Sequence, residues 1–223
     1  MADTEIQRFE DTTSDGPAIR GYLHIPATAS GDGLVLTHGA GANCNSPLLV
    51  ALAAAFCGAG FTALRCDLPF RQLKPKGPPF RGSAEKDQLG LRRAVEVMRR
   101  RNLRHVFLGG HSYGGRQASM LAASETGLAD GLLLLSYPLH PPKRPIELRT
   151  AHFSSLRTQS LFIHGSRDAF GTIEEMSAAL KLIPTPTELL VVENAGHELM
   201  SASNRKDLPE TIVGALRKYF GQC

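Results

Sequence analysis

The sequence predicts an α/β fold, with a mostly parallel, twisted sheet of about eight strands and helices on both of its faces. Short apolar runs alternate with longer segments of helical period, which is typical of repeated strand–helix units. Each connection between the predicted parallel strands is long enough for a crossover helix. The chain has 223 residues, 42% of them hydrophobic, so one core and a single domain over residues 1–223 are expected.

The elements follow in order along the chain. An opening pair of strands, 5–10 and 18–25, flanks residues 14–17 (Ser-Asp-Gly-Pro), whose types favour chain reversal. The later apolar runs predict strands at 33–37, 61–65, 105–109, 131–135, 160–164 and 188–193. The gaps between them predict helices at 46–58, 83–101, 113–125, 172–182 and 207–220.

The most specific motif lies in residues 106–115, where an apolar strand runs into Gly110-x-Ser112-x-Gly114 and then into a segment rich in small residues. A strand that turns sharply into a helix needs small residues two before and two after the exposed residue, because larger side chains would collide. The turn exposes the serine hydroxyl and aims the helix N-terminus at the reacting centre. Ser112 is therefore the predicted nucleophile, and His111 is expected to shape the turn.

A second loop of small residues follows the strand at 33–37, in the order His38-Gly-Ala-Gly. Small residues let backbone N–H groups approach a substrate oxygen, and such a loop supplies half of an oxyanion hole. The predicted donors are the N–H groups of Ala40 and Tyr113, with Gly41 as the alternate to Ala40. His38 is expected to be a structural hydrogen-bonding residue.

A serine nucleophile needs a base, and the base needs an acid that orients it. In this type of fold the acid and then the histidine follow the serine in the chain. Asp168 follows an apolar strand in Gly-Ser-Arg-Asp, and His197 follows the last predicted strand in Ala-Gly-His. Asp67 precedes the serine and Glu193 lies at a strand end, so Asp168 is the preferred acid and His197 the predicted base.

These motifs together resemble the α/β-hydrolase superfamily, and in particular its small, lidless, dienelactone-hydrolase-like group. Residues 65–71 (Arg-Cys-Asp-Leu-Pro-Phe-Arg) also resemble the branch that includes testis-expressed and NSL-complex hydrolase-like proteins. The resemblance implies a carboxylesterase-type serine hydrolase that forms an acyl-enzyme. Dienelactone hydrolases carry cysteine where this chain has Ser112, which argues against their substrate. Amide, peptide or thioester cleavage by the same residues, and a binding module that retains the fold, remain as alternatives.

Two Pro-rich basic loops, 67–82 and 136–149, follow strands and are expected to line the substrate site, since ligands bind at the carboxyl ends of such strands. Neither loop is large enough for a lid domain. Arg116, in the first turn after the serine, is expected to face solvent rather than to contact an anion. The residues predicted to bind substrate are Phe70, Arg71, Arg81, His111 and Tyr137.

The partner predicted from this chemistry is a small acyl substrate; no metal or organic cofactor is expected, and the oligomeric state, monomer or dimer, is left open. The formal charge of +4 is attributed to the solvated face of the helix at 83–101, so nucleic acid is not expected as a partner. No apolar run is long enough to span a bilayer, so no membrane association is expected. The absence of a signal sequence and the four unpaired cysteines favour the cytoplasm.

Overall fold

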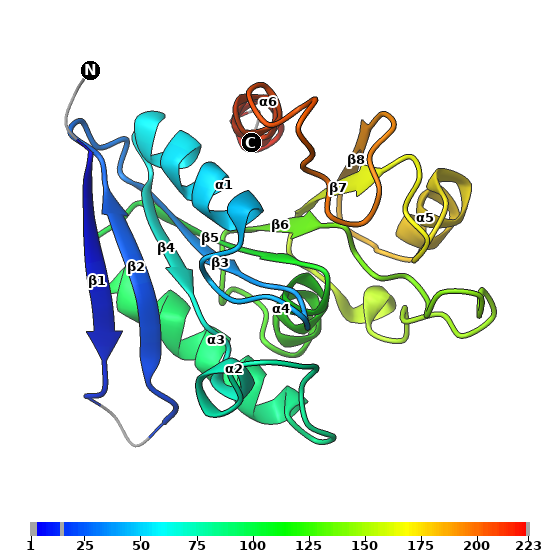
Figure 1. Ribbon diagram of the computed structural model, residues 1–223, viewed down its shortest axis with the longest axis horizontal. Coiled ribbons are helices and arrows are strands. Elements are labelled where there is room, and N and C mark those ends of the chain that lie inside the picture. The colour runs from blue at the N-terminus through cyan, green and yellow to red at the C-terminus, as the bar shows by residue number, and fades with distance from the viewer. Residues whose placement is uncertain (1–3, 14–15, 222–223) are drawn as a thin grey trace.

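A computed structural model describes residues 4–13 and 16–221 and contains one eight-stranded sheet (Figure 1). Its strand order is β1-β2-β4-β3-β5-β6-β7-β8, and β3 to β8 run parallel to one another, while β1 and β2 are antiparallel to their neighbours. The predicted fold class is confirmed. The strands are β1 Glu5–Asp11, β2 Ile19–Ile25, β3 Asp32–Thr37, β4 Thr62–Cys66, β5 His105–His111, β6 Gly131–Leu135, β7 Ser160–Gly165 and β8 Thr187–Val192.

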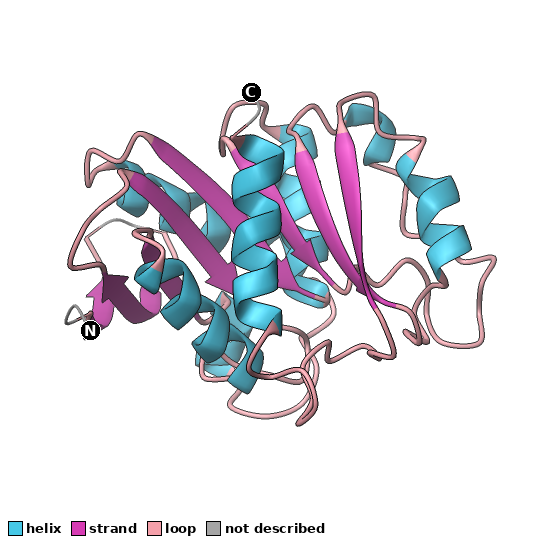
Figure 2. Ribbon diagram, turned by 90° about the horizontal axis from the view of Figure 1, so that it is seen from above, coloured by secondary structure: helices cyan, strands magenta, loops and turns pink. Residues whose placement is uncertain are grey.

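Helices cover both faces of the sheet, which is sandwiched between two apolar layers (Figures 1 and 2). On one face α1 and α6 pack against residues such as Leu36 and Leu133. The other face packs against α2 to α5 through residues such as Val35 and Leu134. The helices are α1 Pro47–Gly58, α2 Pro69–Leu73, α3 Ala84–Arg99, α4 Tyr113–Ser124, α5 Ile173–Leu180 and α6 Leu208–Phe220.

Most predicted boundaries agree with these elements to within two residues, but two short helical pieces were not predicted. Helix α2 lies inside the loop 67–82, where Pro69 occupies a first-turn position that suits its fixed φ angle. A short 3₁₀ helix, Phe153–Ser155, follows the second basic loop. Residues 14 and 15 of the predicted turn, and Cys223, lie outside the described residues; the other three cysteines are buried free thiols. No helix of the described chain combines the length and apolarity that crossing a membrane requires.

The parallel strands place four chain segments at one edge of the sheet. β3 ends at Thr37, β5 at His111, β7 at Gly165 and β8 at Val192, and all four strands point the same way. The segments that follow these strands therefore meet at the carboxyl edge, where ligands bind in open α/β sheets. These segments contain every residue that the sequence assigns to the nucleophile, the acid, the base and the oxyanion loop.

Candidate active site

Ser112 occupies a strained turn between β5 and α4. Its φ of 51° and ψ of −114° lie in a region that non-glycine residues rarely adopt. At both glycines of the motif, other backbone atoms lie too near to leave room for a side chain. A Cβ atom on Gly110 would lie 2.5 Å from the nitrogen of Gly115, and one on Gly114 would lie 2.7 Å from the carbonyl oxygen of His38. The two glycines of the motif are thus required sterically, and they allow the sheet edge to present the Ser112 side chain.

His197 connects Ser112 to Asp168. Its Nε2 atom lies 2.7 Å from Ser112 Oγ, and its Nδ1 atom lies 3.0 and 2.9 Å from the two carboxylate oxygens of Asp168. Nδ1 must therefore carry the proton that it donates to Asp168, which leaves Nε2 free to accept from the serine hydroxyl. The three side chains come from loops after β5, β7 and β8, and the structure brings them together in the order that acyl transfer requires.

Two aromatic residues contact His197, one at its ring and one at its backbone. The ring of Phe170 lies against the His197 ring, with a centroid distance of 4.1 Å and an interplanar angle of 30°. The Phe170 N–H also donates to Asp168 Oδ1 at 2.9 Å. His111 Nε2 donates to the backbone carbonyl oxygen of His197 at 2.8 Å. Phe170 was not predicted, because a lone Phe two residues after an Asp carries no local signal of this contact.

The electrostatics of the cluster keep Asp168 ionised and His111 neutral. Burial raises the pKa of the Asp168 carboxyl, but hydrogen bonds from His197 and Phe170, with the charge of His197, outweigh it and hold the pKa below its usual value. Burial lowers the pKa of His111. A carboxylate that is 6% exposed and remains charged is suited to stabilise an imidazolium beside it.

Gly165 allows the loops of the acid and the base to approach each other. A Cβ atom at this position would lie 2.3 Å from the carbonyl oxygen of Ala195 and 2.7 Å from that of Gly196. The Arg167 N–H also donates to the Ala195 carbonyl at 2.9 Å, which connects the two loops directly. The sequence showed Gly165 as part of a common strand-end motif, and the structure gives the steric reason for it.

The loop after β3 is fixed by its first residue, His38. The Leu68 N–H donates to His38 Nε2 at 3.1 Å, so Nδ1 carries the ring proton and donates to the Gly39 carbonyl at 2.8 Å. Burial lowers the pKa of His38, which favours this neutral form. Because a trans peptide is planar, fixing the Gly39 carbonyl also fixes the direction of the Ala40 N–H. Among the described residues, neither this N–H nor that of Tyr113 has a hydrogen-bond partner.

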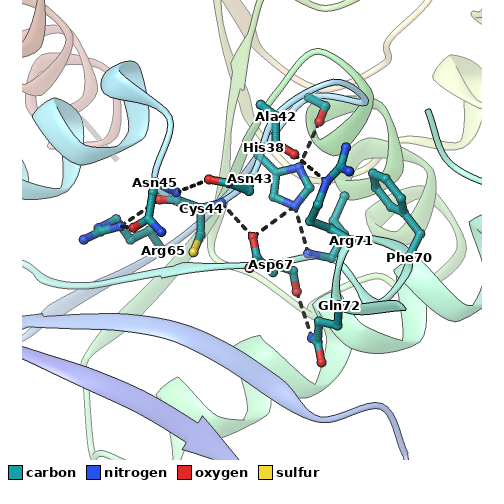
Figure 3. Close-up of polar contacts among 12 residues, drawn as sticks. His38, Ala42, Asn43, Cys44, Asn45, Arg65, Asp67, Phe70, Arg71 and Gln72 are labelled. Atoms are coloured by element: carbon teal, nitrogen blue, oxygen red, sulfur yellow. Dashed lines mark hydrogen bonds and ion pairs between the residues drawn. The ribbon is translucent and has the colours of Figure 1, made fainter. Parts of the chain in front are cut away.

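Arg71 fixes the rest of the same loop (Figure 3). Its guanidinium donates to the carbonyls of Ala40 and Ala42, both at 2.7 Å, and to those of Lys74 and Gly77 at 2.8 and 2.9 Å. The side chain is 5% exposed and lies 4.9 Å from the centroid of the Phe70 ring. The prediction that Arg71 binds substrate is thereby corrected: its donors are already used by backbone carbonyls, and it supports the loop.

The other predicted substrate residues are dispersed. Phe70 and Tyr137 are buried in the core, because their rings pack against neighbouring aromatic side chains, and Arg81 is an exposed loop residue. Two cavities of about 630 and 360 Å³ contact Ser112, and of the five predicted residues only His111 lines either of them. The walls of these cavities are instead formed by loop 39–47, Phe170, Glu198 and residues of α4 and the β6 loop.

In the described part of the chain, no three His, Cys, Asp or Glu side chains cluster as metal ligands would. Residues 30–216 match the sequence pattern of the family described as alpha/beta hydrolase domain. The chain belongs to this α/β-hydrolase family. The resemblance to that superfamily inferred from the motifs is confirmed.

Solved structures extend the comparison over almost the whole α/β-hydrolase chain. A dienelactone hydrolase from Anabaena variabilis is 18% identical, with a TM-score of 0.76 over 97% of this chain and 98% of that one. Est1E from Butyrivibrio proteoclasticus is 15% identical, with a TM-score of 0.76 over 96% and 99%. A lidless α/β serine hydrolase from Xanthomonas campestris is 17% identical, with a TM-score of 0.73 over 97% and 96%. At these identities the likeness is one of fold.

Proposed function

We propose that this α/β-hydrolase is a serine hydrolase that cleaves carboxylic esters of small acyl groups through an acyl-enzyme. The observation that carries the proposal is the 2.7 Å contact between His197 Nε2 and Ser112 Oγ, with His197 Nδ1 held by Asp168. A serine hydroxyl becomes an effective nucleophile only when a base of this geometry takes its proton. The esterases among the structural neighbours support the same reaction class.

The reaction proceeds in two acyl transfers. Ser112 Oγ attacks the ester carbonyl carbon while its proton passes to His197 Nε2, and the carbonyl oxygen becomes an oxyanion bound by the Ala40 and Tyr113 N–H groups. Collapse of this intermediate breaks the bond to the alcohol, which leaves with the proton from His197. Water then attacks the acyl-enzyme by the same route and releases the acid. Asp168 stabilises the imidazolium in both steps and itself stays ionised.

The test is labelling with a fluorophosphonate probe, which reacts with an activated serine. The wild-type protein is expected to be labelled and to hydrolyse p-nitrophenyl esters, and both activities are expected to be lost in Ser112→Ala. Thermal unfolding of the variant provides the control for folding. If the folded wild-type protein resists the probe and cleaves no ester, thioester or anilide of one acyl group, the proposal is wrong and a binding module is the better description.

A further inference from the structure

A second cavity opens at Ser112, beside the larger cleft. It has a volume of about 360 Å³, which is within the range of small-molecule sites, and it shares Ala40, Ser112 and Phe170 with the larger cleft. Arg116 and Arg149 line this smaller cavity, and they do not line the larger cleft. His197 lines only the larger cleft. The two spaces therefore differ in charge and in their access to the general base.

Arg116 reaches the smaller cavity from the first turn of α4, where its backbone N–H donates to the Ser112 carbonyl at 3.0 Å. Its side-chain Nε atom is buried and has no hydrogen-bond partner among the residues that the structure describes. Within residues 4–13 and 16–221, Arg116 forms no ion pair with a carboxylate. A guanidinium without a carboxylate partner leaves its positive charge unbalanced, and an anion bound in the cavity that Arg116 lines would balance it.

Arg149 reaches the same cavity from the loop after β6 and is also without a carboxylate partner in the described chain. Its Nη1 atom has one long contact of 3.4 Å to the Pro138 carbonyl, and the nearby Glu147 pairs with Arg144 instead. Burial lowers the pKa of Arg149, and the positive charge of Arg116 lowers it further. Two half-buried guanidinium groups thus repel each other across a cavity that contains no compensating carboxylate from residues that line it.

The position of His197 assigns a part of the substrate to each space. In acyl transfer the base returns its proton to the leaving group, so the leaving group lies on the side that His197 lines. That side is the larger cleft, which also contains the carboxylate of Glu198. The smaller cavity is then left for the acyl group, next to Ser112 and Tyr113.

The geometry points to a carboxylate-binding acyl subsite, in which Arg116 and Arg149 bind the free carboxylate of an acyl group derived from a short dicarboxylic acid. Guanidinium groups match a carboxylate through paired N–H donors, and a bound anion relieves their mutual repulsion. The inference rests on the proposed function and names its substrate class. It also corrects the sequence-based expectation that Arg116 faces solvent, since the α4 turn places this residue in the cavity wall.

The test compares two esters with the same leaving group and the same chain length, mono-p-nitrophenyl glutarate and p-nitrophenyl pentanoate. Wild-type protein is expected to favour the glutarate ester. Arg116→Gln and Arg149→Gln are each expected to lower kcat/KM for that ester by about tenfold to a hundredfold, and to leave the pentanoate ester unchanged within about twofold. Arg101→Gln, at an exposed arginine, is the matched control and is expected to change neither.

Binding of free glutarate to Ser112→Ala, measured by calorimetry, tests the subsite without turnover. Binding that is lost when either Arg116→Gln or Arg149→Gln is added supports the subsite. If wild-type protein cleaves both esters equally, or if the Gln variants lower both rates equally, the subsite is wrong while the hydrolase function stands. If the probe fails to label Ser112 but glutarate binding depends on both arginines, the proposed reaction is wrong and the carboxylate site stands.

Discussion

Replacing Arg71 distinguishes a residue that supports the oxyanion loop from one that binds an anionic substrate. In Arg71→Met the carbonyls of Ala40 and Ala42 lose their donors, and those of Lys74 and Gly77 lie in a loop that water can reach. Leaving a buried acceptor without a donor costs about 1–3 kcal/mol, so the loss at the Ala40 and Ala42 carbonyls is expected to lower the free energy of unfolding by about 2–6 kcal/mol.

The same substitution is expected to lower the rate of ester hydrolysis. The loop that loses its support contains the Ala40 and Gly41 N–H groups, and loss of one oxyanion donor costs about 10²–10³ in kcat. Arg71→Lys is expected to behave similarly, because one ammonium group cannot reach four carbonyls in different directions. Stability is measured by urea unfolding, and kcat is measured with neutral and anionic p-nitrophenyl esters at a temperature where each variant is folded.

Comparing kcat on neutral and anionic esters distinguishes the two roles of Arg71. A support role predicts that Arg71→Met lowers kcat for neutral and anionic esters by the same factor. A substrate-binding role predicts a loss only for anionic esters. If a folded Arg71→Met protein retains the wild-type kcat on a neutral ester, the reasoning about the loop is refuted. Arg101→Met, which replaces an exposed arginine, is the matched control for both measurements.

Three further substitutions follow from the contacts of the site and the core. Gly165→Ala would place a methyl carbon 2.3 Å from the Ala195 carbonyl oxygen. The kcat is therefore expected to fall at least about tenfold, and the free energy of unfolding by about 1–3 kcal/mol. Gly214→Ala, which adds its methyl group in open space, is the control that is expected to be tolerated. Asp168→Asn is expected to lower kcat by about 10³–10⁴ with little change in KM, measured with a p-nitrophenyl ester, because it favours the wrong histidine tautomer. Burial and then the charge of Arg65 lower the pKa of His24 from 6.5 to about 4. The unfolded state therefore binds the proton more readily, and the free energy of unfolding falls as the pH drops from 6.5 towards 4, by about 3 kcal/mol in all. His24→Gln, followed by urea unfolding at pH 7 and pH 4.5, is expected to remove that part of the pH dependence.

The sheet could be predicted from the sequence because its signals are local. The run at 131–135 is a glycine followed by four leucines, and in the structure all five residues are buried in the interior strand β6. The turn at Ser112 could also be predicted from the sequence, since the two glycines that it requires lie within two residues of it. In both cases the residues that determine the structure lie next to one another in the chain.

Residues whose roles depend on distant contacts could not be predicted. Arg71 lies 31 residues from Ala40, and nothing in the Pro-Phe-Arg stretch shows that its donors are used by that loop. Helix α2, which carries Arg71, has five residues and too little periodicity to be recognised. Arg116 and Arg149 meet only because α4 and the β6 loop lie together at the sheet edge. Basic residues in loops can be seen in a sequence, but their partners cannot.

The charges around Ser112 have a consequence for the direction in which an ester binds. Arg116 and Arg149 make one side positive, and Glu198 makes the other side negative. An ester with a carboxylate in its acyl group is attracted to the first side and repelled from the second, so its alcohol is directed towards His197. In the opposite orientation the carboxylate lies beside Glu198, and the leaving alcohol lies in the smaller cavity, which His197 does not line. Discrimination between the two orientations therefore affects turnover as well as binding, because only one of them completes the proton transfer.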